Sequence, residues 1–140
     1  MIDMKYEIQE CIGARLRGLS RQVDGIYRKY LVGTNITENQ LSIMLALYKT
    51  GEIEQIEIGR ILNLERSSLS RNLTRLIDQN IVAKEGAVNR PLISLTNTGL
   101  KKVKDILPTW ELAMKEVHEM MDEKAYSGFN TFEKAIKGEK

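Results

Sequence analysis

Residues 54–80 read EQIEIGRILNLERSSLSRNLTRLIDQN and are the most informative stretch of this chain for its fold. Apolar residues recur in this stretch at steps of three and four, which predicts one amphipathic helix from Glu54 to Leu62 and a second from about Glu65 to Asn80. Asn63 lies between the two and tolerates the left-handed backbone of a tight turn. The stretch therefore predicts a helix-turn-helix.

The two predicted helices each have an apolar face that we expect to be buried. The residues of these faces are Ile58, Ile61, Leu62, Leu69, Leu73, Leu76 and Ile77. The other face of the second helix carries hydroxyl, amide and guanidinium groups, which can reach base edges and phosphates in a major groove. We therefore expect this face to bind DNA through Arg66, Ser67, Ser68, Ser70, Arg71, Asn72, Thr74 and Arg75.

A β-hairpin is predicted directly after these helices. Residues 81–84 and 92–95 favour strands, and the residues between them are rich in turn formers. Its cations, Lys84 and Arg90, are placed to approach a minor groove, where the negative potential attracts them. Helix, turn, helix and hairpin follow one another in the order of a winged helix-turn-helix.

Three further helices are predicted around this core. Residues 4–31 place their apolar side chains, Cys11 among them, in one stripe of a long helix. Thr37 and Gln40 have the spacing of a capping box and begin a second helix, which Gly51 closes. Thr96 begins another long helix, which we expect Pro108 to kink or interrupt.

The long terminal helices have more apolar surface than one small core can cover, and a last amphipathic segment adds Phe129, Phe132 and Ile136. Dimerisation would cover this surface. The residues expected at the dimer interface are Ile8, Ile12, Leu16, Leu19, Trp110, Val117, Met121 and Phe132. The predicted fold is mainly α with a small β-hairpin wing. Residues 35–96 form the DNA-binding domain in this division, and residues 1–34 and 97–140 form the dimerisation region.

Composition and charge narrow the classes of function. Among residues 55–104, nine Lys and Arg face four Asp and Glu, a net charge of +5 within a chain of net charge +2. Such a basic segment is expected where one part of a protein meets phosphates. No apolar run reaches the roughly 18 residues that a membrane helix needs, and charged residues near the N-terminus argue against a signal peptide. We therefore expect a cytoplasmic protein that does not enter membranes.

Catalysis, metals and cofactors find little support in the sequence. There is no phosphate-binding glycine loop and no nucleophile with a matching base, so we do not expect an enzyme. One cysteine, Cys11, and one histidine, His118, make no thiolate zinc site. We expect Cys11 to pack in its apolar stripe rather than sense peroxide, and His118 to lie at the surface. Trp110 with Met114, Met120 and Met121 could line a ligand pocket, although such spacing is more typical of a core.

Three stretches carry a resemblance to a known family: residues 37–40, residues 58–71 across the helix-turn-helix and residues 93–99 after the hairpin. In order and spacing they resemble the multiple-antibiotic-resistance regulator (MarR) family. The resemblance implies an obligate homodimer whose paired winged domains read a pseudo-palindromic operator in double-stranded DNA, often with a small-molecule or redox input. The chain departs from the family pattern in two features. Glu65 stands where Asp or Ser is usual, and the wing lacks the Asp-x-Arg-Arg pattern.

The function that we expect is a DNA-binding transcriptional regulator, and more specifically a repressor. The alternative is a winged-helix adaptor that presents the same helix to a partner protein. Adaptors often carry acidic or apolar residues on that face, whereas this chain has Arg66, Arg71 and Arg75. The arginines favour DNA.

Overall fold

The computed structural model describes residues 2–139, which contain α-helices and a small antiparallel sheet. The elements in chain order are the 3-10 helix η1 (Ile8–Glu10), α1 (Ile12–Leu31), α2 (Glu38–Thr50), β1 (Ile53–Glu54), α3 (Gln55–Leu62), α4 (Arg66–Asp78), β2 (Val82–Ala87), β3 (Arg90–Leu95), α5 (Asn97–Glu119) and α6 (Glu123–Lys137). The mainly helical fold with a hairpin wing is the one predicted from the sequence.

The chain divides into two compact units. Leu31–Thr109 form the first, here called the winged unit, and the residues up to Tyr30 together with those from Trp110 onward form the second, the helical unit. The winged unit is larger than the predicted domain of residues 35–96 because the first half of α5 packs within it, with Val103 and Ile106 buried.

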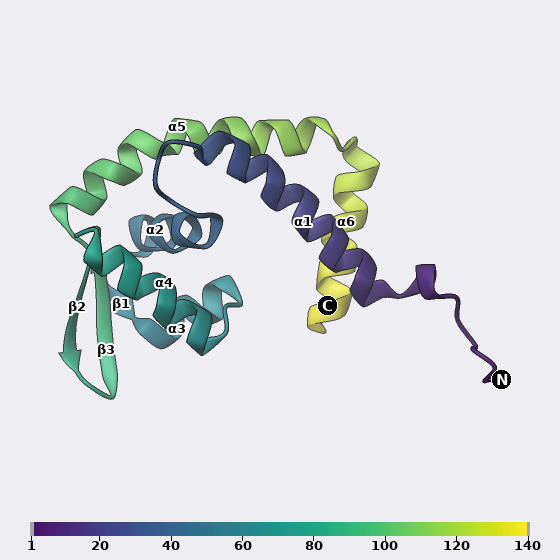
Figure 1. The fold of residues 1–140 in the computed structure, drawn as a ribbon, viewed down its shortest axis with the longest axis horizontal. Coiled ribbons are helices and arrows are strands. Elements are labelled where there is room, and N and C mark those ends of the chain that lie inside the picture. Colours follow the sequence, from purple (N-terminus) through teal and green to yellow (C-terminus); the bar gives the residue numbers. More distant parts are fainter. Residues whose placement is uncertain (1, 140) are drawn as a thin grey trace. The chain divides into compact units, whose positions relative to one another are not determined.

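The helices α2, α3 and α4 of the winged unit lie beside its sheet (Figure 1). Aliphatic side chains from these elements and from the first half of α5 form its core. Its fully buried side chains are Ile43, Met44, Leu47, Ile58, Leu76, Ile93 and Val103. Ile61 and Ile77 were predicted to join them but are 50% and 38% exposed. Each lies beyond the edge of its helix's buried face, because one side of a short helix cannot bury every apolar position.

Local hydrogen bonds set the helix ends of the winged unit as predicted. Thr37 Oγ1 accepts a hydrogen bond from the Gln40 backbone N–H, and Gln40 Oε1 accepts one from the Thr37 N–H, which completes the capping box of α2. Gly51 ends α2 with a positive φ of 78°. Asn63 ends α3 in the left-handed conformation that the sequence predicted.

The sheet has the order β1-β3-β2, with both pairs antiparallel. The hairpin strands extend further toward the tip than predicted, so that Ala87 pairs with Arg90 across the turn. The sequence did not predict β1, because a strand of two residues has no periodicity to detect. β1 is held through its pairing with β3, where Ile53 lies opposite Ile93.

The start of α5 is locked onto the end of α4. Thr96 Oγ1 donates a hydrogen bond to the Asn80 carbonyl and accepts one from the Gly99 N–H, at 2.6 and 2.9 Å. A Cβ atom at Gly99 would lie 2.0 Å from the Ile81 carbonyl oxygen, so only glycine fits this contact. Further along, α5 continues through Pro108 without interruption.

In the helical unit, α1 begins at Ile12 rather than at residue 4, which corrects the predicted range. Residues 2–10 are all exposed, and a helical segment without tertiary cover is marginal in water. Cys11, predicted to pack, is exposed for the same reason. His118 is exposed as expected, and its ring lies 5.1 Å from that of Tyr126.

Polar contacts join α1 to α5 in the helical unit. Glu116 accepts hydrogen bonds from Lys29 Nζ at 2.7 Å and from the Tyr30 hydroxyl at 2.8 Å. These two bonds favour the carboxylate and lower the pKa of Glu116. The Tyr27 hydroxyl lies 2.9 Å from Met114 Sδ, and burial, followed by the charge of Asp24, raises its pKa.

Apolar side chains stay exposed over most of the helical unit. Among its described residues only Ala113 is buried. Those left at least 38% exposed include Ile8, Ile12, Leu16, Leu19, Leu112, Met120, Tyr126, Phe129, Phe132 and Ile136. No helix within residues 2–139 has the length and apolar character that crossing a bilayer requires.

Candidate nucleic-acid interface

The turn between α3 and α4 is tight because of the backbone conformation of one residue. Asn63 takes the left-handed conformation, and the Leu64 N–H then donates a hydrogen bond back to the Gly59 carbonyl at 3.0 Å. Gly59 lies at this approach, and a Cβ atom there would be in ordinary van der Waals contact with the Leu64 carbonyl oxygen at 3.4 Å. This turn fixes the direction in which α4 leaves α3.

Glu65 precedes α4 as its N-cap residue and makes no side-chain hydrogen bond to the first turn. The sequence predicted this weak cap from the residue type. The N–H groups of the first turn are therefore not occupied by the capping side chain, and a helix N-terminus in this state attracts anions.

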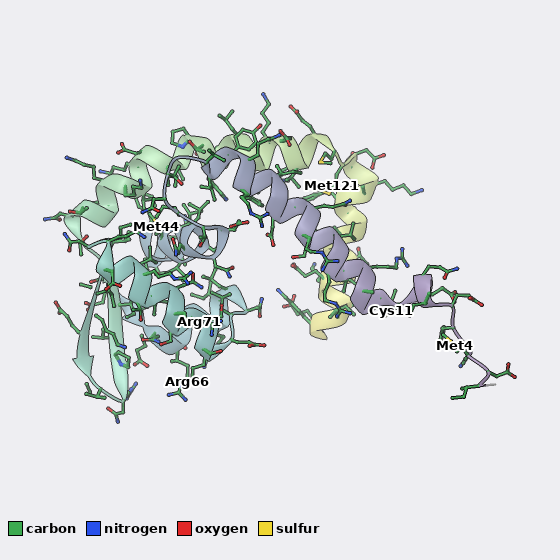
Figure 2. All side chains as sticks on the ribbon, in the orientation of Figure 1. Met4, Cys11, Met44, Arg66, Arg71 and Met121 are labelled. Carbon is green, nitrogen blue, oxygen red and sulfur yellow. The ribbon has the colours of Figure 1, made fainter. Side chains whose placement is uncertain are left out.

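The outer face of α4 is exposed and basic. Leu69, Leu73 and Leu76 are buried on the inner side, as predicted. On the outer side, the exposed residues are Arg66, Ser67, Ser70, Arg71, Thr74 and Arg75. Arg66 and Arg71 extend from the side of α4 away from Met44 (Figure 2). Within residues 2–139, none of the three arginines of this face has an ion-pair partner.

The structure corrects the prediction for Asn72. Its side chain is only 9% exposed, and its Nδ2 donates a hydrogen bond to the Ser68 carbonyl at 2.9 Å. Asn72 lies one position before Leu73 and one turn before Leu76, so the helical period turns it toward the core. Ser68 is half-buried. These two residues support the helix, whereas their exposed neighbours form the candidate surface.

The two cations of the wing do not lie together. Lys84 pairs with Ile93 across the hairpin, whereas Arg90 lies two residues along β3 from Leu92, so their side chains leave opposite faces of the sheet. Arg90 Nη2 also donates a hydrogen bond to Glu54 Oε1 at 2.7 Å. This ion pair could not be predicted from the sequence, because it depends on the pairing of β1 with β3 and β1 is too short to show a periodic pattern.

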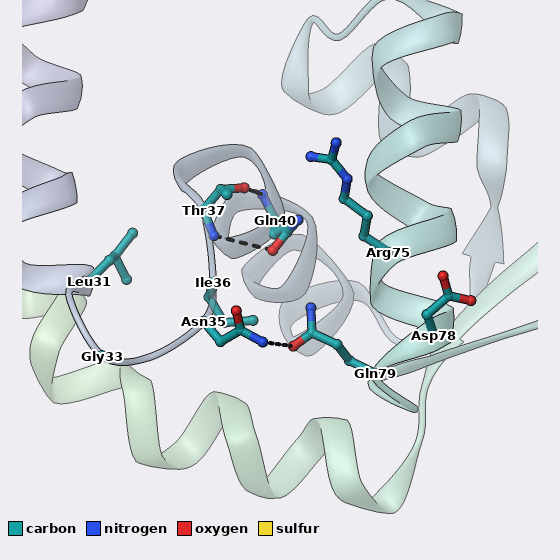
Figure 3. Close-up of a pocket in the computed structure, with 9 residues that line it drawn as sticks. All are labelled: Leu31, Gly33, Asn35, Ile36, Thr37, Gln40, Arg75, Asp78 and Gln79. Carbon is teal, nitrogen blue, oxygen red and sulfur yellow. Dashed lines mark hydrogen bonds between the residues drawn. The ribbon is translucent and has the colours of Figure 1, made fainter.

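A pocket of about 520 Å³ lies between the start of α2 and the end of α4. Figure 3 shows Arg75 reaching from α4 toward Gln40, whose own side chain is held by the capping box of α2. The residues that line the pocket are Leu31, Gly33, Asn35, Ile36, Thr37, Gln40, Arg75, Asp78 and Gln79. Arg75 therefore stands at the edge of the α4 surface and belongs to this pocket as well.

Comparison with known families gives the assignment. Residues 36–89, which include α2 to α4 and most of the hairpin, match the sequence profile of the MarR family. Residues 36–89 are a MarR-family domain. The resemblance drawn from the sequence motifs is confirmed. Within this domain, α4 is the second helix of the helix-turn-helix, and its outer face is exposed.

Solved structures with the same fold include three that superpose over nearly the whole chain. BpsR of Bordetella bronchiseptica, whose DNA binding is regulated by 6-hydroxynicotinic acid, is 16% identical with a TM-score of 0.85, over 96% of this chain and 99% of its own. PcaV of Streptomyces coelicolor with its natural ligand is 16% identical, TM-score 0.81, over 97% and 98%. A mutant MarR of E. coli with operator DNA is 18% identical, TM-score 0.79, over 94% and 99%. A sequence search of curated proteins found no match.

Proposed function

We propose that this chain is a DNA-binding transcriptional regulator that acts as a homodimer on a pseudo-palindromic operator and represses transcription. One observation carries the proposal: α4 is buried on its apolar side, and on its exposed side it presents three arginines that have no ion-pair partner within residues 2–139, with hydroxyl groups between them. The MarR family of the domain and the operator complex of the structurally similar E. coli protein support it.

The roles proposed for the α4 side chains follow from their positions. Arg66, Ser67 and Ser70 stand in the first turns, where short side chains and the helix N-terminus can bind phosphates. Arg71 is one turn further along, and its planar guanidinium can form two hydrogen bonds with a guanine edge. Thr74 Oγ1 already donates to the Ser70 carbonyl, which leaves its oxygen to accept from a base or water.

The homodimer is proposed for the helical unit. A stable monomer rarely exposes so many large apolar residues over two neighbouring segments, and burying them against a second copy would remove them from water. Of the residues predicted at this interface, Ile8, Ile12, Leu16, Leu19 and Phe132 are exposed, while Trp110, Val117 and Met121 are half-buried. These grounds apply to the helical unit; we keep the predicted division, residues 1–34 and 97–140 for dimerisation and residues 35–96 for DNA binding, with the first half of α5 also packing in the winged unit.

A small-molecule effector would act on such a dimer by changing the spacing of its two α4 helices. Two proteins of the same fold support an effector here, since BpsR is regulated by 6-hydroxynicotinic acid and PcaV was solved with a natural ligand.

The deciding experiment is a binding titration of the purified protein against its own upstream DNA and a shuffled control, across a range of salt concentrations. Contacts to phosphates release counterions, so affinity should fall steeply as salt rises. Preference for the upstream DNA with this salt dependence would support an autoregulating dimer. Weak and equal binding to both DNAs would contradict autoregulation, and no binding at any salt would favour a protein–protein adaptor.

A further inference from the structure

The register of the wing surrounds Arg90 with carboxylates. Glu54 on β1 and Glu85 on β2 both lie opposite Leu92 on β3, one on each side of it. Arg90 is two residues from Leu92 on the same strand, so its side chain leaves the same face and is a diagonal neighbour of both acids. This face of the wing therefore has one cation and two anions.

Arg90 is held by one of these acids. Its Nη2 lies 2.7 Å from Glu54 Oε1, and the side chains of Arg90 and Glu54 are 70% and 33% exposed. The Glu54 carboxylate is available for this bond because it does not cap α3, although Glu54 is the N-cap residue of that helix. A surface ion pair of this kind favours the paired state by a factor of roughly 2 to 5.

No other cation of the wing replaces Arg90 on this face. The side chain of Lys84 is on the other face of the hairpin, because Lys84 pairs with Ile93. The tip between the strands, Val88 and Asn89, carries no charge, and Val88 is fully exposed.

We propose that Glu54 is a positioning residue that holds Arg90 away from DNA, so that Arg90 makes no cationic contact with the minor groove. The electrostatic part of DNA binding then comes from α4 and not from Arg90. This inference rests on the proposed function, because it concerns how the same surface binds DNA.

The test compares the salt dependence of DNA binding for Glu54→Ala, Arg90→Ala and the double variant. One added phosphate contact steepens the plot of log affinity against log salt by about 0.9. Glu54→Ala should free Arg90, steepen the slope by about that amount and raise affinity at low salt roughly 2- to 5-fold. Arg90→Ala should leave the wild-type slope unchanged, and the double variant should return to it.

Glu52→Ala is the matched control, since it removes an exposed carboxylate two residues away that has no ion-pair partner among the described residues. An equal gain in affinity in this control would overturn the proposal, because a general change of charge would then explain the result. A loss of slope in Arg90→Ala would also overturn it, because Arg90 would already contact DNA.

Thermal unfolding of each variant checks that it folds. Glu54→Gln removes the charge but keeps the size of the side chain, and it should steepen the salt dependence as Glu54→Ala does. If the wild-type protein shows no salt-dependent binding, the proposed function fails. If it binds and the slopes of the variants do not differ as stated, only the role of Glu54 fails.

Discussion

Gly99 is the residue with the least freedom to change. It lies in the first turn of α5, where a Cβ atom would lie 2.0 Å from the Ile81 carbonyl oxygen and 2.9 Å from its carbon. Both atoms belong to the backbone and cannot rotate away. We expect Gly99→Ala to lower the free energy of unfolding by about 3 kcal/mol or more, at the upper end of overpacking costs, as measured by urea denaturation.

Gly59→Ala is the control for this prediction, because Gly59, like Gly99, lies in a helix of the winged unit. A Cβ atom at Gly59 would contact the Leu64 carbonyl oxygen at 3.4 Å and Leu69 Cδ2 at 3.5 Å, which are ordinary separations. Alanine also favours the helix over glycine by roughly 0.5–1 kcal/mol. Gly59→Ala should therefore be neutral or slightly stabilising. Equal losses in both variants would contradict the explanation from backbone contact.

Glu116 gives the helical unit a dependence on pH. Its bonds from Lys29 and Tyr30 lower its pKa from the ordinary value of 4.5. Because the pKa in the folded state is below that of the unfolded chain, the stabilisation is present above pH 4.5 and is lost as the pH falls through the folded value. Thermal unfolding followed from about pH 6 to about pH 3 should show less change in Glu116→Gln than in the wild type.

Glu111→Gln serves as the comparison on the same helix, since Glu111 has no hydrogen-bond or ion-pair partner among residues 2–139. Its pH profile should follow the wild type. If Glu116→Gln kept the full acid dependence, the contacts with Lys29 and Tyr30 would not be its source.

At the scale of the element, α4 combines two tasks on one helix. Leucines at steps of three and four fasten it to the core, which leaves the remaining positions to face outward. Arg71 lies on that outward face with no ion-pair partner in the described chain. If it reads a base, Arg71→Ala should weaken operator binding by about 1–3 kcal/mol, as measured by fluorescence anisotropy, and leave the dimer intact.

Arg21→Ala is the corresponding control in α1, where an exposed arginine is removed from the helical unit. It should bind the operator as the wild type does. Loss of the dimer in Arg71→Ala, seen by analytical ultracentrifugation, would contradict the assignment of α4 to DNA.

At the scale of the whole molecule, the two units differ in how much of their apolar surface they cover. The winged unit has a buried aliphatic core, whereas the helical unit buries only Ala113 among its described residues. A charge placed within the proposed interface would have to be buried without a partner. We expect Leu19→Glu and Phe132→Glu each to shift the protein to monomers in sedimentation equilibrium, and to lose tight operator binding because one winged unit has half of the contacts.

Val88→Glu tests whether any added charge has this effect. Val88 is a large apolar residue that is fully exposed, and it belongs to the wing rather than to the helical unit. This variant should remain a dimer. Monomers in Val88→Glu, or dimers in both interface variants, would argue against the helical unit as the interface.

The sequence alone determined the features that depend on neighbouring residues. The capping box of Thr37 and Gln40, the left-handed turn at Asn63 and the leucine face of α4 were all predicted, because each arises within a few residues of chain. The hairpin and the order of the winged fold followed for the same reason. The exposed arginines of α4 could be predicted because they lie opposite those leucines in the helical period.

Features that depend on contacts between distant residues could be seen only in the folded chain. β1 exists because β3 pairs with it, and the bond from Arg90 to Glu54 exists because that pairing sets their register. Asn72 lies inward because packing, and not residue type, decides which polar groups are buried. The segment before Ile12 is not part of α1, because a weak helix needs tertiary contacts to persist. Periodicity describes one element at a time, so it cannot report which elements meet.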